Sequence, residues 1–318
     1  MDSLDLRMPI DSLLTAYETH LGAPQPIDCL PIKKGASGRT IVRLQAAPAS
    51  AVPSVIAIHY TFEREDNALH YPISLLLEQA GVQVPRILHA DLESQILLVE
   101  DIGGNDLLDL RDEPWEVRLP YYRATFEQLA RLSAVTPPTD TPMMPAFTAE
   151  TYRWEQQYFA THFLGTHLGQ DSAAFLADQR MTQLATELGA RQPDLVHRDF
   201  QSQNLMLRDG GVYVIDFQGA RPGYVEYDLA SFIYDPYMRH PQEERESLLA
   251  LWTEVSGRAL QPDLLRHCAM QRLMQALGAY GNIVHNQGDD WYAQHIAPAS
   301  EMLLTLVAGT EYEELFQF

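Results

Sequence analysis

The stretch LVHRDFQSQNLMLRDGGVYVIDFQGA, residues 195–220, places ionisable and amide side chains between short apolar runs. His197 and Asp199 lie two residues apart, Asn204 follows five residues after the aspartate, and Asp216 ends the next apolar run. Each residue alone fits a polar β-hairpin, in which an aspartate makes turn contacts or caps the following segment. All four at this spacing, each on the expected type of element, favour a reaction centre.

The order H-R-D-x-x-x-x-N is the spacing of a kinase catalytic loop, and kinases carry Asp-Phe-Gly at the end of the following strand. Phosphoryl transfer to an alcohol needs a carboxylate that orients the hydroxyl and takes its proton, which predicts Asp199 as the base. It also needs hard oxygen ligands for Mg²⁺, which predicts Asn204 and Asp216 as metal ligands and ATP with Mg²⁺ as cofactors. His197 completes the predicted catalytic pair as a residue that holds the loop through the backbone.

Three segments, HRDFQSQNLM, VIDFQGA and EYDLAS, resemble the aminoglycoside phosphotransferase and choline kinase superfamily, the small-molecule relatives of protein kinases. Asp228 lies only 12 residues after Asp216, which leaves no room for the long activation loop that seats a peptide. The acceptor is therefore expected to be a small molecule. By the same resemblance, Asp228 buttresses the catalytic loop.

Hydrophobic periodicity predicts a small β-rich part followed by a larger helical part. With the resemblance, this implies an α+β, protein-kinase-like two-lobed fold: a nucleotide-binding N-lobe at 1–100, and a C-lobe at 101–318 with the catalytic loop, metal ligands and acceptor site. The acidic, glycine-containing stretch 100–106 is the expected hinge. The expected strands are 30–33, 40–44, 54–60, 86–90, 95–99 and 212–215, and the expected helices are 9–22, 66–81, 114–134, 148–165, 173–190, 226–235, 242–256, 262–280 and 291–308.

A loop reading GASGRT, at 35–40, lies between two predicted strands, where its backbone N–H groups can cradle phosphates. A plain hairpin turn is the alternative. The strand-three lysine of kinases is missing, since the expected position falls at or near His59 and the only lysines are Lys33 and Lys34. The cationic partner of the phosphates is then Arg39, our first choice, one of the other basic residues nearby, or the metal alone. The predicted nucleotide-binding residues are Gly35, Ser37, Gly38, Arg39, Arg43, Glu100 and Ile102.

Within the superfamily, segments 35–44, 80–103, 214–237 and 270–281 resemble anomeric sugar kinases of bacterial cell-wall recycling. Those enzymes phosphorylate N-acetylmuramate and N-acetylglucosamine at C1, so the resemblance implies the C1 hydroxyl of an amino sugar as acceptor. Hydroxyl-binding and ring-stacking side chains are what a sugar pocket requires, and an arginine would suit the muramate carboxylate. The candidate acceptor residues are Gln201, Gln218, Asp235, Arg272, Tyr280 and Trp291.

The formal net charge of −21 argues against a nucleic-acid or anionic-membrane partner. Two cysteines make no disulfide framework, and neither a signal peptide nor a membrane-spanning run is visible, so a cytoplasmic location is expected. Three alternatives stay open. They are an aminoglycoside O-phosphotransferase, for which the acidity would suit a polycationic acceptor, a choline- or homoserine-type kinase, and a nucleotide-binding pseudokinase module.

Overall fold

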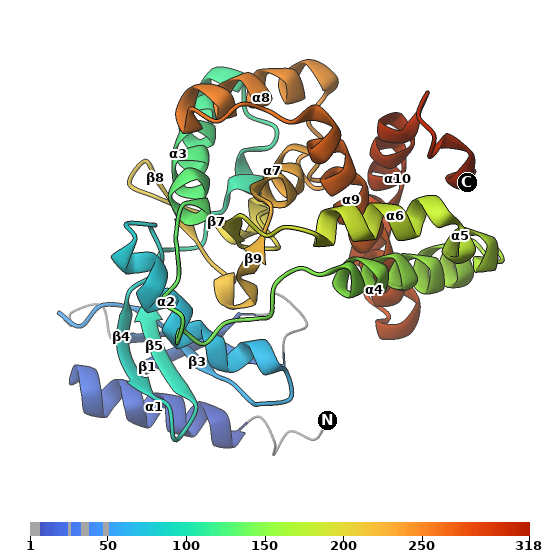
Figure 1. Cartoon of the computed structure of the whole chain (residues 1–318). Coiled ribbons are helices and arrows are strands. Elements are labelled where there is room, and N and C mark those ends of the chain that lie inside the picture. Colours follow the sequence, from blue (N-terminus) through green and yellow to red (C-terminus); the bar gives the residue numbers. More distant parts are fainter. Residues whose placement is uncertain (1–6, 25–26, 33–37, 47–50) are drawn as a thin grey trace. The chain divides into compact units, whose positions relative to one another are not determined.

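The computed structural model describes residues 7–24, 27–32, 38–46 and 51–318 (Figure 1). The chain forms two compact units. Unit 1 comprises the described residues up to Asn105 together with 137–144 and 206–219, and unit 2 comprises 106–136, 145–205 and 220–318.

The composition of unit 1 differs from the expected N-lobe, because the hairpin after the catalytic loop belongs to it. The backbone N–H of Leu207 donates to the carbonyl of Asn105, and that of Val214 donates to the carbonyl of Gln83. These bonds attach the hairpin strands β7 (Leu205–Arg208) and β8 (Gly211–Val214) to the end of the β-rich part. Sequence periodicity registers local pattern only, so this long-range pairing was not visible in it.

The sheet of unit 1 has five antiparallel strands in the order β1-β2-β3-β5-β4. Each strand carries β-branched or other apolar residues that pack on a pleated surface. In the central strand β3 the register pairs His59 with Thr40 on one side and with Ile96 on the other. The strands are β1 (Ile27–Pro31), β2 (Thr40–Ala46), β3 (Val55–His59), β4 (Ile87–Asp91) and β5 (Ile96–Glu100).

Helices cover both faces of this sheet (Figure 1). On one face, α1 (Arg7–Leu21) buries Leu13 and Tyr17 against alternate residues of β2 and β3. On the other face, η1 (Glu65–Leu69) and α2 (His70–Gln79) cover the opposite set of side chains. Because successive residues of a strand point to opposite faces, α1 packs on one set of side chains of the central strands, and η1 and α2 pack on the other set.

Unit 2 is helical, and α9 (Pro262–Asn282) lies at its centre, in contact with α4, α7 and α10. Thirteen of its 21 residues are buried, which explains why the helix is apolar on most sides rather than on one stripe. The other helices of this unit are α3 (Trp115–Ser133), α4 (Ala149–Phe159), α5 (Ala173–Ala177), α6 (Gln179–Gly189), α7 (Val225–Ile233), α8 (Gln242–Ser256) and α10 (Ala293–Val307). In the described part of the chain, no helix has the length and apolar character needed to cross a membrane.

Two predicted helices of unit 2 are interrupted. The expected helix 148–165 is α-helical to Phe159 and continues as a π-helix over Ala160–His167. The expected helix 173–190 breaks at Asp178, whose carboxylate accepts the backbone N–H of Arg180 at 2.8 Å and so starts a new helix.

The predicted catalytic loop begins directly after β6 (Asp194–Val196), which pairs with β9 (Arg221–Gly223) in a two-stranded antiparallel sheet. Neither strand is predictable from the sequence, because three residues are too few for a periodicity to be recognised.

Candidate active site

The turn into the catalytic loop is held by a buried carboxylate. Directly after β6, Arg198 adopts φ +81°, a left-handed conformation that is strained for a residue with a side chain. The fully buried Asp228 compensates, since its two oxygens accept the backbone N–H of His197 at 2.6 Å and of Arg198 at 2.9 Å. Burial raises the pKa of Asp228 to about 7, against the effect of the two N–H donors. The Asp228 side chain therefore fixes the backbone of the loop at His197 and Arg198.

Asp199 stands at the open side of this turn. Its backbone N–H donates to Nδ1 of His197 at 3.2 Å, and its carbonyl accepts from Nδ2 of Asn204 at 2.9 Å. These two contacts fix the main chain on both sides, while 42% of the Asp199 side chain is exposed. Because Nδ1 accepts this N–H, a neutral His197 carries its proton on Nε2. Because Asn204 donates with its amide nitrogen, its amide oxygen is the atom of metal-ligand type.

One oxygen of the Asp199 carboxylate accepts from Nη2 of Arg272 at 2.6 Å. The Arg272 side chain is buried, and its other donors reach Ser231, Gln275 and Gln201. Burial lowers the pKa of this guanidinium, but the carboxylate of Asp199 and the nearby tyrosines outweigh the burial, so the net pKa is raised and the group stays charged. Arg272, which the sequence predicts as a residue that binds the acceptor substrate, is thus hydrogen-bonded to Asp199, the predicted base.

Asp235, a second predicted acceptor residue, is completely buried. Its carboxylate accepts the backbone N–H of Ser202 at 2.9 Å and of Tyr237 at 2.8 Å. These bonds connect the catalytic loop to the segment that follows α7. The placement favours a bracing role for Asp235 over contact with an acceptor.

Aromatic side chains gather next to this brace. The Tyr237 ring packs against Trp291 with centroids 5.7 Å apart, against Tyr280 at 6.0 Å and against His295 at 4.6 Å. Tyr280 is buried, whereas Trp291 is 43% exposed. Burial raises the pKa of Tyr280, and the Asp199 carboxylate contributes to the same shift, so the cluster lies within electrostatic range of the predicted base. Tyr280 and Trp291 are predicted acceptor residues, whereas Tyr237 is not; the sequence feature that could have indicated Tyr237 is its position two residues after Asp235.

In unit 1, Asp216 follows β8 with φ +63°. Its Oδ1 accepts from Nη2 of Arg39 at 2.5 Å and from Nε2 of Gln218 at 3.0 Å. Burial lowers the pKa of the neighbouring His70 to about 4, with Arg39 adding to the effect and Asp216 opposing it. A neutral imidazole therefore packs on Phe217, with ring centroids 4.9 Å apart. Gln218, a predicted acceptor-substrate residue, is thus hydrogen-bonded to Asp216, the predicted metal ligand.

The two candidate arginines of the nucleotide end lie in different surroundings. Arg39 forms an ion pair with Asp216, and only 8% of the Arg39 side chain is exposed. Arg43 donates to both oxygens of Asp101, at 2.7 and 3.0 Å, and to the carbonyl of Gly103. Ser54 donates to the same carboxylate at 2.6 Å. The contacts of Arg43 fasten β2 to the segment after β5, and only Arg39 reaches the predicted metal ligand.

The predicted hinge residues are engaged through their side chains. The Glu100 carboxylate accepts from Nε of Arg86 at 3.1 Å and from Nη2 of Arg208 at 2.9 Å. The Ile102 side chain is buried. Contact of their backbone with an adenine edge stays a prediction.

The predicted glycine-rich loop is described only at its end. Gly38 is exposed and has φ +68°, where a side chain would be strained. Gly35 and Ser37, with Lys33 and Lys34, lie outside the described residues.

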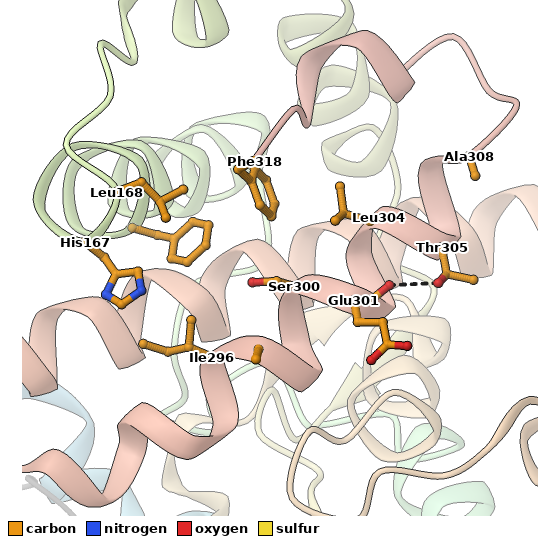
Figure 2. Close-up of a pocket in the computed structure, with 11 residues that line it drawn as sticks. His167, Leu168, Ile296, Ser300, Glu301, Leu304, Thr305, Ala308 and Phe318 are labelled. Carbon is orange, nitrogen blue, oxygen red and sulfur yellow. Dashed lines mark hydrogen bonds between the residues drawn. The ribbon is translucent and has the colours of Figure 1, made fainter.

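A groove of about 640 Å³ in unit 2 shares no residue with the predicted site (Figure 2). Apolar side chains of α10 and of the π-helix 160–167 line it together with Phe318, and its polar lining residues are His167, Ser300, Glu301 and Thr305. Figure 2 shows the hydroxyl of Thr305 donating to the carbonyl of Glu301, a bond within the helix.

Taken with the antiparallel sheet and the helical unit, the catalytic loop defines a phosphotransferase of the protein-kinase-like fold. The sequence profile of the phosphotransferase enzyme family matches residues 28–264, and the chain belongs to this family. The predicted fold and the predicted enzyme class are confirmed.

Among sequence relatives, the chain is 29% identical over 304 residues to an N-acetylmuramate/N-acetylglucosamine kinase of Pseudomonas aeruginosa, covering 90% of this chain and 86% of that one. Among solved structures, a choline/ethanolamine kinase family protein from Mesorhizobium loti matches with a TM-score of 0.64 and 12% identity, covering 97% and 98% of the two chains. An amicoumacin kinase, solved in complex with AMP-PNP, Ca²⁺ and Ami, matches with a TM-score of 0.64 and 13% identity, covering 99% of this chain and 100% of that one.

Proposed function

We propose that this phosphotransferase moves the γ-phosphoryl group of ATP to the anomeric hydroxyl of N-acetylmuramate or N-acetylglucosamine. The carrying observation is the partly exposed Asp199 carboxylate on a loop that Asp228 and Asn204 hold rigid. The name of the Pseudomonas aeruginosa relative, aligned over 90% of the chain, supports these sugars as acceptors.

Asp199 orients the C1 hydroxyl and receives its proton. As the C1 oxygen forms a bond to the γ-phosphorus, the bond from that phosphorus to the bridging oxygen of ADP breaks. The products are ADP and the sugar 1-phosphate, and Asp199 returns its proton to water. The ring oxygen withdraws electron density from C1, so this hemiacetal hydroxyl releases its proton more readily than the other sugar hydroxyls.

Asn204 and Asp216 are the proposed ligands of a hard divalent cation, because an amide oxygen and a carboxylate are the oxygen donors that such a cation prefers. Magnesium supplies charge neutralisation on the β- and γ-phosphates when bound. Two protein ligands are enough, since Mg²⁺ keeps water and phosphate oxygens as its other ligands. Among the described residues no three His, Cys, Asp or Glu side chains gather as a self-sufficient metal site.

At the nucleotide end, Arg39 takes the place of the missing lysine. Its guanidinium lies on the metal ligand Asp216, which is where the phosphates of a metal–nucleotide complex are held in this class of enzyme. A guanidinium binds phosphate oxygens in a bidentate fashion, so arginine can serve in this role. The glycine-rich loop and the backbone near Glu100 and Ile102 complete the proposed nucleotide site.

The acceptor site is built from unit 2. The exposed ring of Trp291 can stack on a pyranose, and the buried Tyr237 and Tyr280 support it from within the aromatic cluster next to Asp199. We place the reaction in the cytoplasm, where ATP is available, and in the recycling of cell-wall amino sugars.

The test is a turnover assay with Mg-ATP and a panel of acceptors, followed by mass spectrometry of the products. The panel comprises N-acetylmuramate, N-acetylglucosamine, their 1-O-methyl glycosides, two aminoglycosides and choline. We expect monophosphorylated sugars and no product from the methyl glycosides, which lack a free C1 hydroxyl. Phosphorylated methyl glycosides would show transfer to another hydroxyl. Turnover of aminoglycosides or choline alone, or no turnover by a protein that still binds ATP, would contradict the proposal.

A further inference from the structure

Arg272 contacts the predicted base directly, from the middle of α9. Its Nη2 donates to Oδ1 of Asp199 at 2.6 Å and to Oε1 of Gln201 at 3.2 Å. The amide nitrogen of Gln201 in turn faces the other oxygen of Asp199 at 3.5 Å. The Arg272 guanidinium and the Gln201 amide thus contact different oxygens of the Asp199 carboxylate.

The guanidinium is itself fixed by two further contacts. Its Nε donates to the hydroxyl of Ser231 on α7 at 2.8 Å, and its Nη1 donates to Oε1 of Gln275, one turn further along α9, at 2.5 Å. The planar fork of an arginine loses little freedom when several donors are engaged together. Helix α9 and helix α7 therefore hold the Arg272 head group in one position.

Two roles can be set against each other for this residue. As a ligand for the carboxylate of an acceptor, Arg272 would have to present free donors to the acceptor. Side chains of the protein already accept from Nε and from both terminal nitrogens of the guanidinium. As a positioning residue, it would have to be rigid, buried and in contact with the base, and it has all three properties.

We propose that Arg272 is a positioning residue, whose guanidinium orients the Asp199 carboxylate toward the acceptor hydroxyl, rather than a ligand for the acceptor's own carboxylate. The inference rests on the proposed function, because Asp199 is the base of that reaction. Its physical basis is orientation, since a misplacement of about 1 Å at a reacting group can reduce a rate about 100-fold. Ser231 and Gln275 act one step further out, by holding the guanidinium.

The experiment compares N-acetylmuramate, which has a carboxylate, with N-acetylglucosamine, which has none. Wild-type protein and the variants Arg272→Gln, Arg272→Lys and Ser231→Ala are assayed with both sugars at saturating Mg-ATP. We expect Arg272→Gln to lower kcat about 100-fold with both sugars alike and to leave the KM for ATP unchanged. Arg272→Lys should recover part of the rate, because an ammonium can still donate to Asp199 without the fork. Ser231→Ala should lower kcat by a smaller factor.

Arg118→Gln is the matched control, because Arg118 is equally buried and pairs with Glu244 at 2.5 Å in the same unit. It should lose thermal stability as Arg272→Gln does while keeping kcat. If Arg272→Gln does not fold, Ser231→Ala and Arg272→Lys carry the test.

The results separate the alternatives. A rise in KM for N-acetylmuramate alone would make Arg272 a ligand of the acceptor carboxylate, and an unchanged kcat in all three variants would remove it from the reaction. If wild-type protein phosphorylates neither sugar, the proposed function fails. Arg272 is then judged by hydrolysis of ATP with water as acceptor, where the same loss of kcat supports the positioning role and an unchanged rate overturns it.

Discussion

Arg39 and Arg43 are four residues apart in the sequence, yet their head groups have different partners. Arg39 reaches Asp216, whereas Arg43 is held by Asp101 and Gly103. We predict that Arg39→Gln raises the KM for ATP about tenfold, which corresponds to the loss of about 1.4 kcal/mol of charged hydrogen bonding. Arg43→Gln should leave that KM within about twofold and lower the melting temperature instead. Steady-state kinetics and thermal melting of both variants check this, and equal effects on the KM for ATP would contradict the assignment of Arg39.

Asp228 gives the catalytic loop a pH-dependent support. Its pKa is raised from 3.8 to about 7 by burial, with the Asp199 carboxylate raising it further and Arg272 and the two N–H donors lowering it. The folded protein therefore binds a proton at Asp228 between about pH 4 and pH 7 that the unfolded chain does not bind. Stability linked to this group is fully present below the unfolded pKa and is lost as the pH rises through 7.

The variant Asp228→Asn isolates this effect. It loses one of the two acceptors for the loop N–H groups, so it should be less stable than wild type at pH 5, but it has no carboxyl group to ionise. We expect the difference in the free energy of unfolding between the two proteins to shrink from pH 5 to pH 8, by up to a few kcal/mol. Urea unfolding at both pH values measures it. A gap that widens with pH would show that the buried carboxylate is favoured in its charged form.

At the scale of elements, two glycines let α9 approach its neighbours. A Cβ at Gly278 would lie 2.9 Å from the backbone nitrogen of Phe159, and one at Gly281 would collide with the carbonyl oxygen of His162. Alanine is the better helix former by about 1 kcal/mol, but backbone atoms cannot move aside as a side-chain end can.

We predict that Gly281→Ala destabilises the protein by about 2 kcal/mol in spite of its helix propensity. Gly104→Ala is the control, because an added Cβ at that exposed position meets nothing within 4 Å and the backbone is not left-handed. Denaturant unfolding of both variants decides the matter, and equal stabilities for the two would refute close packing along α9.

The elements also show how far sequence reasoning reaches. The sheet strands β2 to β5 and most of the long helices were predictable because the apolar residues of each repeat at a regular spacing, whereas β1 lies at Ile27–Pro31 rather than at the expected 30–33. The strands β6 and β9, at 194–196 and 221–223, were not, since each has only three residues and its partner is distant in the sequence. The π-helical turn 160–167 and the break at Asp178 depend on tertiary packing and capping, which a periodicity of 3.6 does not report.

The candidate site was predictable to a similar degree. Asp199, Asn204 and Asp216 were found from spacing, because the chemistry of phosphoryl transfer fixes their types and order. The contacts of Arg272 and Asp235 were not predictable, because the sequence does not show whether an arginine or aspartate side chain faces a substrate or a neighbouring side chain. The three-dimensional structure is needed to show that Arg272 donates to the Asp199 carboxylate and that Asp235 accepts the backbone N–H groups of Ser202 and Tyr237.

For the whole molecule, the dominant physical property is its charge. The chain has 43 acidic and 22 basic residues and a net charge of −21, so self-repulsion opposes the compact state. We predict that the melting temperature rises by several degrees between 10 and 200 mM KCl, because the Debye length falls from about 30 Å to below 10 Å. A fall in melting temperature over this range would mean that attractive ion pairs outweigh the repulsion.

The central claim is that Asp199 is the base for transfer to a sugar hydroxyl. Single-turnover phosphorylation of N-acetylglucosamine by wild type and by Asp199→Asn, at saturating Mg-ATP, tests it most directly, with binding of a non-hydrolysable ATP analogue measured in parallel. We predict a rate at least about 100-fold lower for Asp199→Asn and an affinity for the analogue within about twofold of wild type. A variant that phosphorylates the sugar at a rate near that of wild type would contradict the account.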